Sequence, residues 1–189
     1  MKDELFGKDL VLESERLVLR PLEERDAEDV FEIFSDGEVM RYYDLLPFKS
    51  MEEARRQTRF FMQSLKDRTM IRWGIELREN AKLVGTCGLF AFSDDDKKAE
   101  MGYELNRNYQ RRGIMGEALT LVLGFAFASS DMNRIEAFIE PPNTASQALA
   151  GRLGFIREGE MRDYELCRGK LIDITLWALL RRDWEIVGK

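Results

Sequence analysis

The chain has no histidine among its 189 residues. This absence excludes a histidine general base, the Ser-His and Cys-His catalytic pairs, and every metal motif that needs an imidazole ligand. Any proton transfer must therefore use carboxylates, tyrosine, lysine, a thiol, a hydroxyl or water. We expect no bound metal.

Cysteine, long apolar runs and excess positive charge are also scarce. Cys87 and Cys167 lie far apart, which is typical of free thiols rather than of a disulfide framework. No apolar run approaches the ~20 residues of a membrane span, and the charged N-terminus lacks the apolar core of a signal peptide. The net charge is −6, which disfavours direct nucleic-acid binding and favours a cationic partner. We expect a cytoplasmic protein without membrane or nucleic-acid partners.

The rest of the composition is that of an ordinary folded chain. Hydrophobic residues make up 44% and charged residues 34%, enough to build a sizeable core under a charged surface. The length suits one domain, and there are no internal repeats or linkers. We expect a single domain over residues 1–189.

Hydrophobic periodicity and capping residues predict the order of helices and strands. Strands are expected over 16–22, 71–77, 83–92, 99–105, 134–140, 155–166 and 170–180. Helices are expected after the cap Asp26, after the Ser50–Glu53 capping box, over 113–128, and over 143–153 with Asn143 as N-cap. This order predicts an α+β fold with a mixed, mostly antiparallel sheet of about seven strands flanked by about four helices.

Two of the expected strands carry informative alternation. In 71–77, apolar residues such as Ile71 and Trp73 alternate with Arg72, which predicts a half-buried strand. In 99–105, Met101, Tyr103 and Leu105 share one face, whereas Glu100, Gly102 and Glu104 share the other. The two glutamates should therefore point to the same side of the sheet.

The segment "YQRRGIMGEAL" (109–119) places glycines at the start of a helix, where they weaken it. The first turn of a helix has unpaired N–H groups and partial positive charge, which together favour an anion such as phosphate. Gly113 would let the backbone approach the anion, and Arg111 and Arg112 would add charge. Tight packing of the helix on a strand is the alternative reason for the glycine. The spacing matches neither a P-loop nor a dinucleotide fingerprint.

The same segment resembles the acetyl-CoA pyrophosphate loop of the GNAT N-acetyltransferases, Q/R-x-x-G-x-G/A. Gln110 and Gly113 match that motif, and Met115 takes its last small position. Gly116 and Glu117 resemble the form found in the RimJ/RimL-type branch, which acetylates the N-termini of ribosomal proteins. The resemblance covers almost the whole chain, through "RLVLRPLEERDAEDV", "LVGTCGL", "AEMGYEL", "NTASQALAGRLGF" and the closing hairpin.

The resemblance implies acetyl-CoA as co-substrate and a GNAT fold. The strand before the loop would splay from the next strand, and the pantetheine arm would lie in the gap. The residues expected to bind acetyl-CoA are Leu105, Asn106 and Arg107 by their backbone, Gln110, Arg111, Arg112, Gly113, Ile114, Met115, Gly116 and Glu117 in the loop, and Asn143 and Ser146 beyond it.

The resemblance also implies the acid and the base of the transfer. Many family members have a tyrosine seven residues after the asparagine as the acid for the thiolate, but Ala150 stands there. The RimL-like branch uses the serine that corresponds to Ser146, and a glutamate that corresponds to Glu165 as base through a water. Glu100 and Glu104 are rival bases.

Several acceptors and one non-catalytic role are open at this point. The resemblance favours the α-amine of a basic protein N-terminus, in particular that of a ribosomal protein. A small amine, such as a polyamine, an aminoglycoside or an amino acid, is the first alternative. An acyl-CoA-binding sensor is the second: the missing tyrosine favours it, whereas Ser146 and Glu165 together count against it. A homodimer is an open alternative to a monomer.

Overall fold

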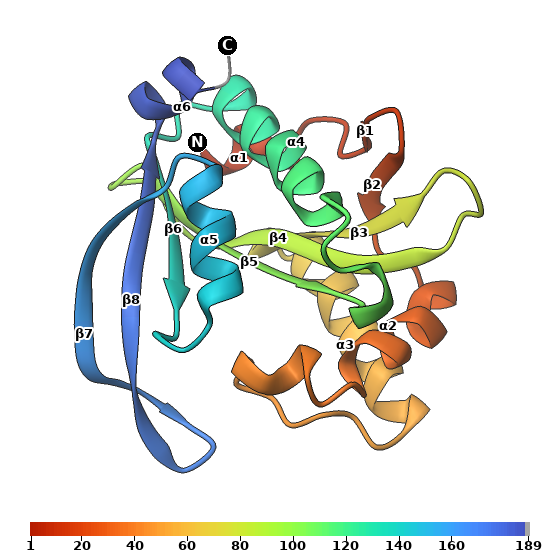
Figure 1. Ribbon diagram of the computed structural model, residues 1–189. Helices are drawn as coiled ribbons and strands as arrows, with labels where there is room; N and C mark the ends of the chain where they lie inside the picture. Colours follow the sequence, from red (N-terminus) through yellow and green to blue (C-terminus); the bar gives the residue numbers. More distant parts are fainter. Residues whose placement is uncertain (188–189) are drawn as a thin grey trace.

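The computed structural model describes residues 1–187 and centres on one eight-stranded sheet (Figure 1). Its strands are β1 (Leu12–Glu13), β2 (Leu17–Pro21), β3 (Met70–Leu77), β4 (Leu83–Ser93), β5 (Lys98–Leu105), β6 (Arg134–Ile139), β7 (Ile156–Cys167) and β8 (Lys170–Leu180). Their order across the sheet is β1-β2-β3-β4-β5-β6-β8-β7. The pair β5–β6 is parallel and its neighbours are antiparallel. All the predicted strands are present, and the short β1 is additional.

The helices include the four that were predicted. They are α1 (Lys2–Phe6), α2 (Ala27–Phe34), α3 (Met51–Lys66), α4 (Ile114–Ser129), α5 (Thr144–Arg152) and α6 (Arg181–Val187), with short 3-10 turns η1 (Glu24–Asp26), η2 (Val39–Tyr42) and η3 (Arg107–Tyr109). Helices α1 and α6 were not predicted. Within residues 1–187, no helix combines the length and the apolar character that crossing a membrane requires.

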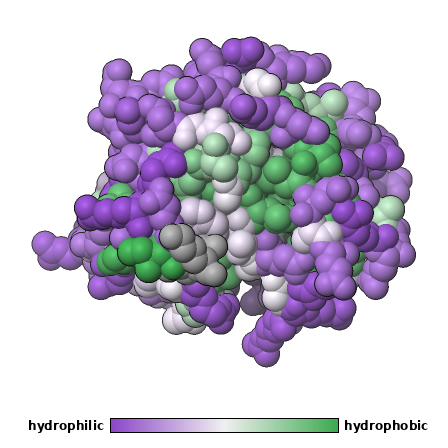
Figure 2. Space-filling model, turned by 90° about the horizontal axis from the view of Figure 1, so that it is seen from above, coloured by the Kyte–Doolittle hydropathy of each residue, from purple (hydrophilic) through white to green (hydrophobic). Residues whose placement is uncertain are grey.

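Helices cover both faces of the sheet and bury a separate core on each (Figure 1). Helices α4 and α5 pack on one face around Trp73 and Leu119, whereas α2 and α3 pack on the other around Phe34 and Phe61. Figure 2 looks down on the α4 side and shows an apolar area within a hydrophilic surface. Helix α4 is apolar on most of its sides, as its sequence suggests.

All three predicted caps stand at the starts of their helices, and two of them are bonded through their side chains. Glu53 Oε2 accepts the Ser50 N–H at 2.9 Å, which completes the capping box of α3. Asn143 Oδ1 accepts the Ser146 N–H at 3.2 Å at the start of α5. Asp26 does not cap α2 with its side chain, because its carboxylate binds the Arg20 guanidinium at 2.8 Å.

Strand β3 is buried on both faces, so the prediction of a half-buried strand is wrong. Arg72 is only 4% exposed, because its guanidinium forms an ion pair with the buried Glu104. Arg72 Nε also donates to Thr86 Oγ1 at 2.9 Å, and the guanidinium lies 5.2 Å from the Phe61 ring centre. The charged residue Arg72 in the alternating pattern of β3 therefore belongs to a buried ion pair and does not indicate a solvent-exposed face.

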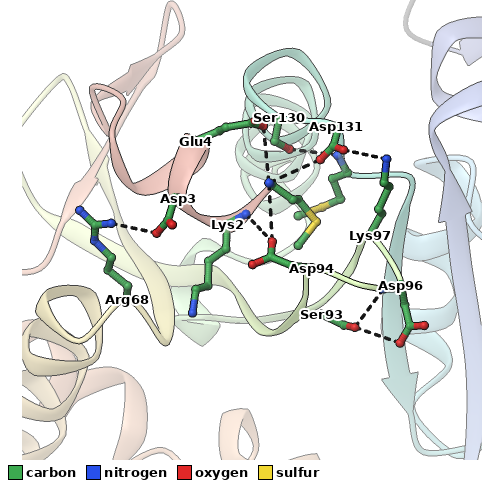
Figure 3. A network of polar contacts seen from close by, with 12 residues as sticks. Lys2, Asp3, Glu4, Arg68, Ser93, Asp94, Asp96, Lys97, Ser130 and Asp131 are labelled. Atoms are coloured by element: carbon green, nitrogen blue, oxygen red, sulfur yellow. Dashed lines mark hydrogen bonds and ion pairs between the residues drawn. The ribbon is translucent and has the colours of Figure 1, made fainter.

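Polar contacts attach the N-terminal helix to the rest of the domain (Figure 3). The Lys2 N–H donates to Asp94 in the β4–β5 turn at 2.8 Å, and Arg68 donates to Asp3 at the same distance. Lys97 pairs with Asp131 beyond the end of α4. Such exposed pairs add little stability individually, so α1 is held mainly by Leu5, which is fully buried.

Candidate active site

Strands β5 and β6 separate after a short parallel stretch. Their pairing covers only 98–100 against 134–136, although β5 continues to Leu105 and β6 to Ile139. The Asn106 N–H donates to Val84 O at 2.8 Å, toward β4. Because backbone groups alternate along a strand, those of Met101, Tyr103 and Leu105 point toward the gap. The expected splay is present, and it leaves an unpaired strand edge.

The backbone groups of Asn106 are not free, contrary to expectation. Its N–H is used by Val84 O, and its C=O accepts the Tyr109 N–H at 2.9 Å. Its side chain is also engaged, since Nδ2 donates to Glu32 Oε1 at 2.8 Å. The open edge therefore lies earlier, at Met101–Leu105, where the Leu105 C=O already accepts from the Gln110 side chain at 3.1 Å. The Arg107 C=O accepts from Gln110 N at 3.3 Å, so it too is partly used.

The loop before α4 has an unusual backbone. Gly113 is the N-cap of α4 with φ of 77°, a left-handed conformation that favours glycine, and Arg111 also has a positive φ of 62°. A Cβ on Gly113 would meet nothing nearer than Arg16 Nη2 at 3.8 Å. Tight packing therefore does not explain this glycine. Left-handed residues before a helix start turn N–H groups to one side, which suits an anion.

The side chains of the loop divide into exposed and buried sets. Arg111 and Arg112 are exposed, so both cations are free to reach outlying phosphates. Ile114 and Met115 are buried in the α4 core, so only their backbone N–H groups can face a ligand. The small residue Gly116 lies one turn further, beside Leu149 of α5.

Glu117 and Gln110 hold the loop in place. The Glu117 carboxylate accepts from Ser14 Oγ at 2.6 Å and from Arg16 Nε at 2.9 Å, and the Glu117 N–H donates to Gly113 O at 3.0 Å. The Gln110 side chain donates to Leu105 O at 3.1 Å. Because the side chains of Glu117 and Gln110 are already bonded within the protein, they stabilise the conformation of the loop.

A cleft of about 620 Å³ opens where β5 and β6 separate. Its walls come from the segment after η2, from α3, from β3 to β6, from the start of α5 and from the β7–β8 hairpin. Aromatic rings supply much of the lining, namely Tyr42, Tyr43, Phe60, Phe61, Phe90, Tyr103 and Phe138. The residues that line the cleft do not include the loop of residues 110–117, so the loop and the cleft are separate regions.

The charges in the cleft are mostly negative. Its carboxylates are Asp44, Glu100, Glu140 and Glu165, whereas the cation among the described lining residues, Arg72, is already paired with Glu104. Burial raises the pKa of Glu100, and the neighbouring Glu136 and Glu165 raise it further. Burial and Glu165 also raise the pKa of Glu140. Crowded negative charge of this kind favours a cation in the cleft.

Ser146 is half-buried in the first turn of α5 and lines the cleft. Its Oγ lies 2.5 Å from the Tyr103 hydroxyl, which reaches it from β5. Asn143 lines the cleft as well, and its side-chain oxygen is used to cap α5. The sequence predicted only which face of the strand Tyr103 occupies. It gave no signal for the contact with Ser146.

The three glutamates weighed as bases are in different environments. Glu165 lines the cleft on β7 and is exposed, and Glu100 lines it on β5 and is half-buried. Glu104 is fully buried beneath the cleft, where Arg72 and Thr86 bind its carboxylate. This geometry makes Glu104 a structural ion-pair partner and leaves Glu165 and Glu100 facing the space where a substrate would bind.

A bulge in β7 lies immediately before Glu165. Met161 pairs with Ile174 and Glu165 with Ile172, so residues 162–164 of β7 lie opposite Asp173 of β8. Asp163 lies in this bulge with φ of 50°, and its N–H donates to Asp173 Oδ1 at 2.8 Å. Such irregularities re-aim side chains, and they are not visible in the strand pattern of the sequence.

Arg168 joins the two sides of the cleft. It lies at the tip of the β7–β8 hairpin, and its Nη2 donates to the backbone oxygens of Met40, Tyr43 and Leu45 at 2.6 to 2.8 Å. Tyr42 adds a contact to the other side, since its hydroxyl donates to Pro142 O at 3.2 Å. The sequence did not single out Arg168.

Comparisons with known proteins agree with this geometry. The family model of the acetyltransferase (GNAT) domain matches residues 16–156. The chain belongs to the GNAT acetyltransferase family. An uncharacterized N-acetyltransferase of Bacillus licheniformis, p20, is 36% identical over 173 residues, covering 92% of this chain and 97% of that protein. The crystal structure of a GNAT-family acetyltransferase from Bacillus anthracis aligns with a TM-score of 0.82 at 26% identity, covering 91% and 99% of the two chains.

A further relative matches only part of the acetyltransferase. The [ribosomal protein uS5]-alanine N-acetyltransferase of Escherichia coli (strain K12) is 38% identical over 84 residues, covering 44% of this chain and 43% of that protein. The expected GNAT fold is therefore confirmed, with eight strands in place of about seven. The protein is an acetyl-CoA-dependent N-acetyltransferase.

Proposed function

We propose that this acetyltransferase moves the acetyl group of acetyl-CoA to the α-amine of a basic protein N-terminus, in particular that of a ribosomal protein. The observation that carries the proposal is the cleft beside the splay, which Ser146 lines together with carboxylates such as Glu100 and Glu165. A cationic chain end is complementary to that charge. The likeness to the uS5-alanine N-acetyltransferase supports an α-amine of a ribosomal protein as the acceptor.

The available base also favours an α-amine. An α-amine has a reference pKa of about 7.7–8.0, against about 10.4 for lysine, so far more of it is neutral at pH 7. Glu165 is an exposed carboxylate that would take the proton through a water. Such a weak base removes a proton more readily from the more acidic α-ammonium group than from a lysine ammonium, and the chain has no histidine to act as a stronger base.

Acetyl-CoA is the second substrate, and the residues beside the cleft suit it. Its pyrophosphate would bind the N–H groups of the loop around Arg111 to Gly116, with Arg111 and Arg112 on the outer phosphates. Its pantetheine arm would pair with backbone groups of the β5 edge before the Leu105 C=O, which Gln110 already uses, and this takes the place of the expected contact with Asn106. Ser146 would then protonate the departing thiolate, and its loss should slow turnover by about 10²–10⁴-fold.

A matched acceptor panel tests the proposal. One basic peptide is offered with a free and with a blocked N-terminus, beside spermidine and an aminoglycoside, and kcat/KM is measured for each. We expect acetylation of the free peptide and little of the blocked one, whose lysines are unchanged. Equal acetylation of both peptides would refute the α-amine preference.

Two other results would replace the proposal with an alternative. Preferred acetylation of spermidine or the aminoglycoside would identify a small-amine acetyltransferase, which the same acidic and aromatic cleft could serve. Binding of acetyl-CoA without turnover of any amine would instead support a sensor. Unbiased labelling of a cell lysate with radioactive acetyl-CoA would then name the acceptor.

A further inference from the structure

Tyr103 is a polar residue of the cleft that the expected acid–base pair does not use. Its hydroxyl lies 2.5 Å from Ser146 Oγ and 3.5 Å from Ser146 O. The contact joins β5, at the splay, to the first turn of α5. It therefore connects the strand edge offered to the pantetheine arm with the serine expected to meet the thiolate.

Both partners of this contact are held in place. The Tyr103 ring packs against the core beneath α4 and α5. The Ser146 N–H is bonded to Asn143 Oδ1 at 3.2 Å, which fixes the first turn of α5. A hydroxyl between two fixed elements has little rotational freedom, so Tyr103 determines how the Ser146 hydroxyl is oriented.

The two hydroxyls differ in acid strength. A serine hydroxyl does not titrate in the range of the ordinary ionisable side chains, so Ser146 needs a group behind it to replace any proton it gives. A phenol ionises near pH ~10. Burial raises the pKa of Tyr103, which therefore keeps its proton at neutral pH. The acid position that the family resemblance places at Ala150 has no hydroxyl, and Tyr103 brings a phenol to α5 from another element.

We propose that Tyr103 is the positioning residue behind Ser146 and the source of the proton that Ser146 gives to the leaving thiolate. The amine nitrogen forms the new C–N bond, and the C–S bond breaks with its electron pair going to sulfur. The Ser146 proton passes to that sulfur, and the Tyr103 proton passes to Ser146 Oγ. Water reprotonates the tyrosinate, which balances the proton that the amine releases to solvent. This inference rests on the proposed function.

The test is a double-mutant cycle on turnover with the best amine of the acceptor panel. Tyr103→Phe keeps the ring and removes the hydroxyl, and we expect kcat to fall about 10- to 100-fold, less than for a lost general acid. The Kd of acetyl-CoA and the KM of the acceptor should stay within about twofold, because the thiolate exists only late in the reaction. In a Ser146→Ala background, Tyr103→Phe should have no further effect.

The outcomes separate this inference from the function on which it rests. If the wild-type protein acetylates no amine, or if Ser146→Ala turns over at the wild-type rate, the proposed function or its acid is wrong and the inference falls with it. If Ser146→Ala is slow but Tyr103→Phe is not, the inference alone is wrong. If the two effects multiply, Tyr103 acts independently of Ser146, which also overturns it.

Discussion

The two halves of this acetyltransferase are assembled in different ways. Most of the half expected to bind acetyl-CoA is continuous in sequence, because the edge of β5, the loop and the start of α4 all lie within residues 101–117, and Asn143 and Ser146 are its later members. The acceptor half combines residues 36–70 with the hairpin of residues 161–173. Arg168 holds those two segments together through carbonyls as far as 128 residues away.

The two halves differ in whether backbone groups or side chains are expected to bind the substrate. The acetyl-CoA half offers backbone N–H and C=O groups, which any sequence with the right φ and ψ angles supplies. The acceptor half offers side chains, whose positions depend on contacts between distant segments. A short motif can therefore predict the first half, whereas the second needs the tertiary structure. Each of the following experiments tests that contrast, from the largest expected effect to the smallest.

Replacing the proposed base should lower kcat, whereas replacing the buried glutamate should lower it far less, so kcat distinguishes the cleft carboxylates from Glu104. Glu165→Gln should lower kcat by about 10²-fold or more if it deprotonates the amine. The loss should be greatest at low pH, where more of the amine is protonated. Glu104→Gln should change kcat far less, because that carboxylate binds Arg72 and Thr86 beneath the cleft. A larger kcat defect in Glu104→Gln or Glu100→Gln than in Glu165→Gln would reassign the base.

Breaking the buried ion pair should affect folding more than chemistry. Arg72→Met leaves Glu104 buried without its partner, and we expect the free energy of unfolding to fall by about 3–5 kcal/mol. Replacing both residues, as in Arg72→Met with Glu104→Leu, should recover most of that loss. Urea unfolding monitored by tryptophan fluorescence measures both. A loss below about 1 kcal/mol for Arg72→Met would mean that the pair is not effectively buried.

Changing the loop glycine should weaken acetyl-CoA binding without involving the acceptor. Gly113→Val adds a branched side chain at the expected phosphate site and strains a residue with φ of 77°. We expect the Kd of acetyl-CoA to rise at least about tenfold, or ~1.4 kcal/mol. Gly113→Ala is the milder version, since a Cβ there has room but not a favourable φ.

The control for the loop glycine is another glycine of the same helix. Gly124→Ala lies inside α4, where the nearest neighbour of an added Cβ is Trp184 at 3.9 Å. It should stabilise the helix by about 0.5–1 kcal/mol and leave the Kd unchanged. An unchanged Kd in a folded Gly113→Val protein would remove the pyrophosphate from this loop.

Acid should weaken acceptor binding by a few fold. The pKa values of Glu100 and Glu140 are raised, so these groups take up protons at a higher pH than an ordinary glutamate, whose pKa is about 4.3. As the pH falls through the raised values the cleft loses negative charge, and the KM of a cationic acceptor should rise. Glu100→Gln should flatten this dependence. A KM that falls on acidification would contradict it.

Salt gives the smallest expected effect and a direct comparison of the halves. Screening should raise the KM of a basic peptide about two- to threefold between low and physiological salt, because the peptide meets exposed carboxylates such as Asp44 and Glu165. A neutral peptide with the same free N-terminus should respond less. The same response from both peptides would show that cleft charge does not recruit the acceptor.

The sequence was most informative where local rules decide structure. Alternation predicted the long strands, and the capping residues Ser50 and Asn143 predicted the starts of α3 and α5. The glycines predicted the loop at the start of α4. The structure shows that Gly113 is needed there for its positive φ and not for close packing. Helix α1 was missed, because a short helix carries no periodic pattern long enough to recognise.

By itself the sequence determined the order of the elements, the position of the glycine loop at a helix start and the absence of histidine chemistry. Those properties follow from neighbouring residues. Only the tertiary structure decided that Arg72 is buried on Glu104, that β7 bulges just before Glu165, and that Tyr103 contacts Ser146. Each of those contacts joins atoms far apart in the chain, whose distance depends on register, bulges and packing between elements, and no local pattern of residue types encodes that distance.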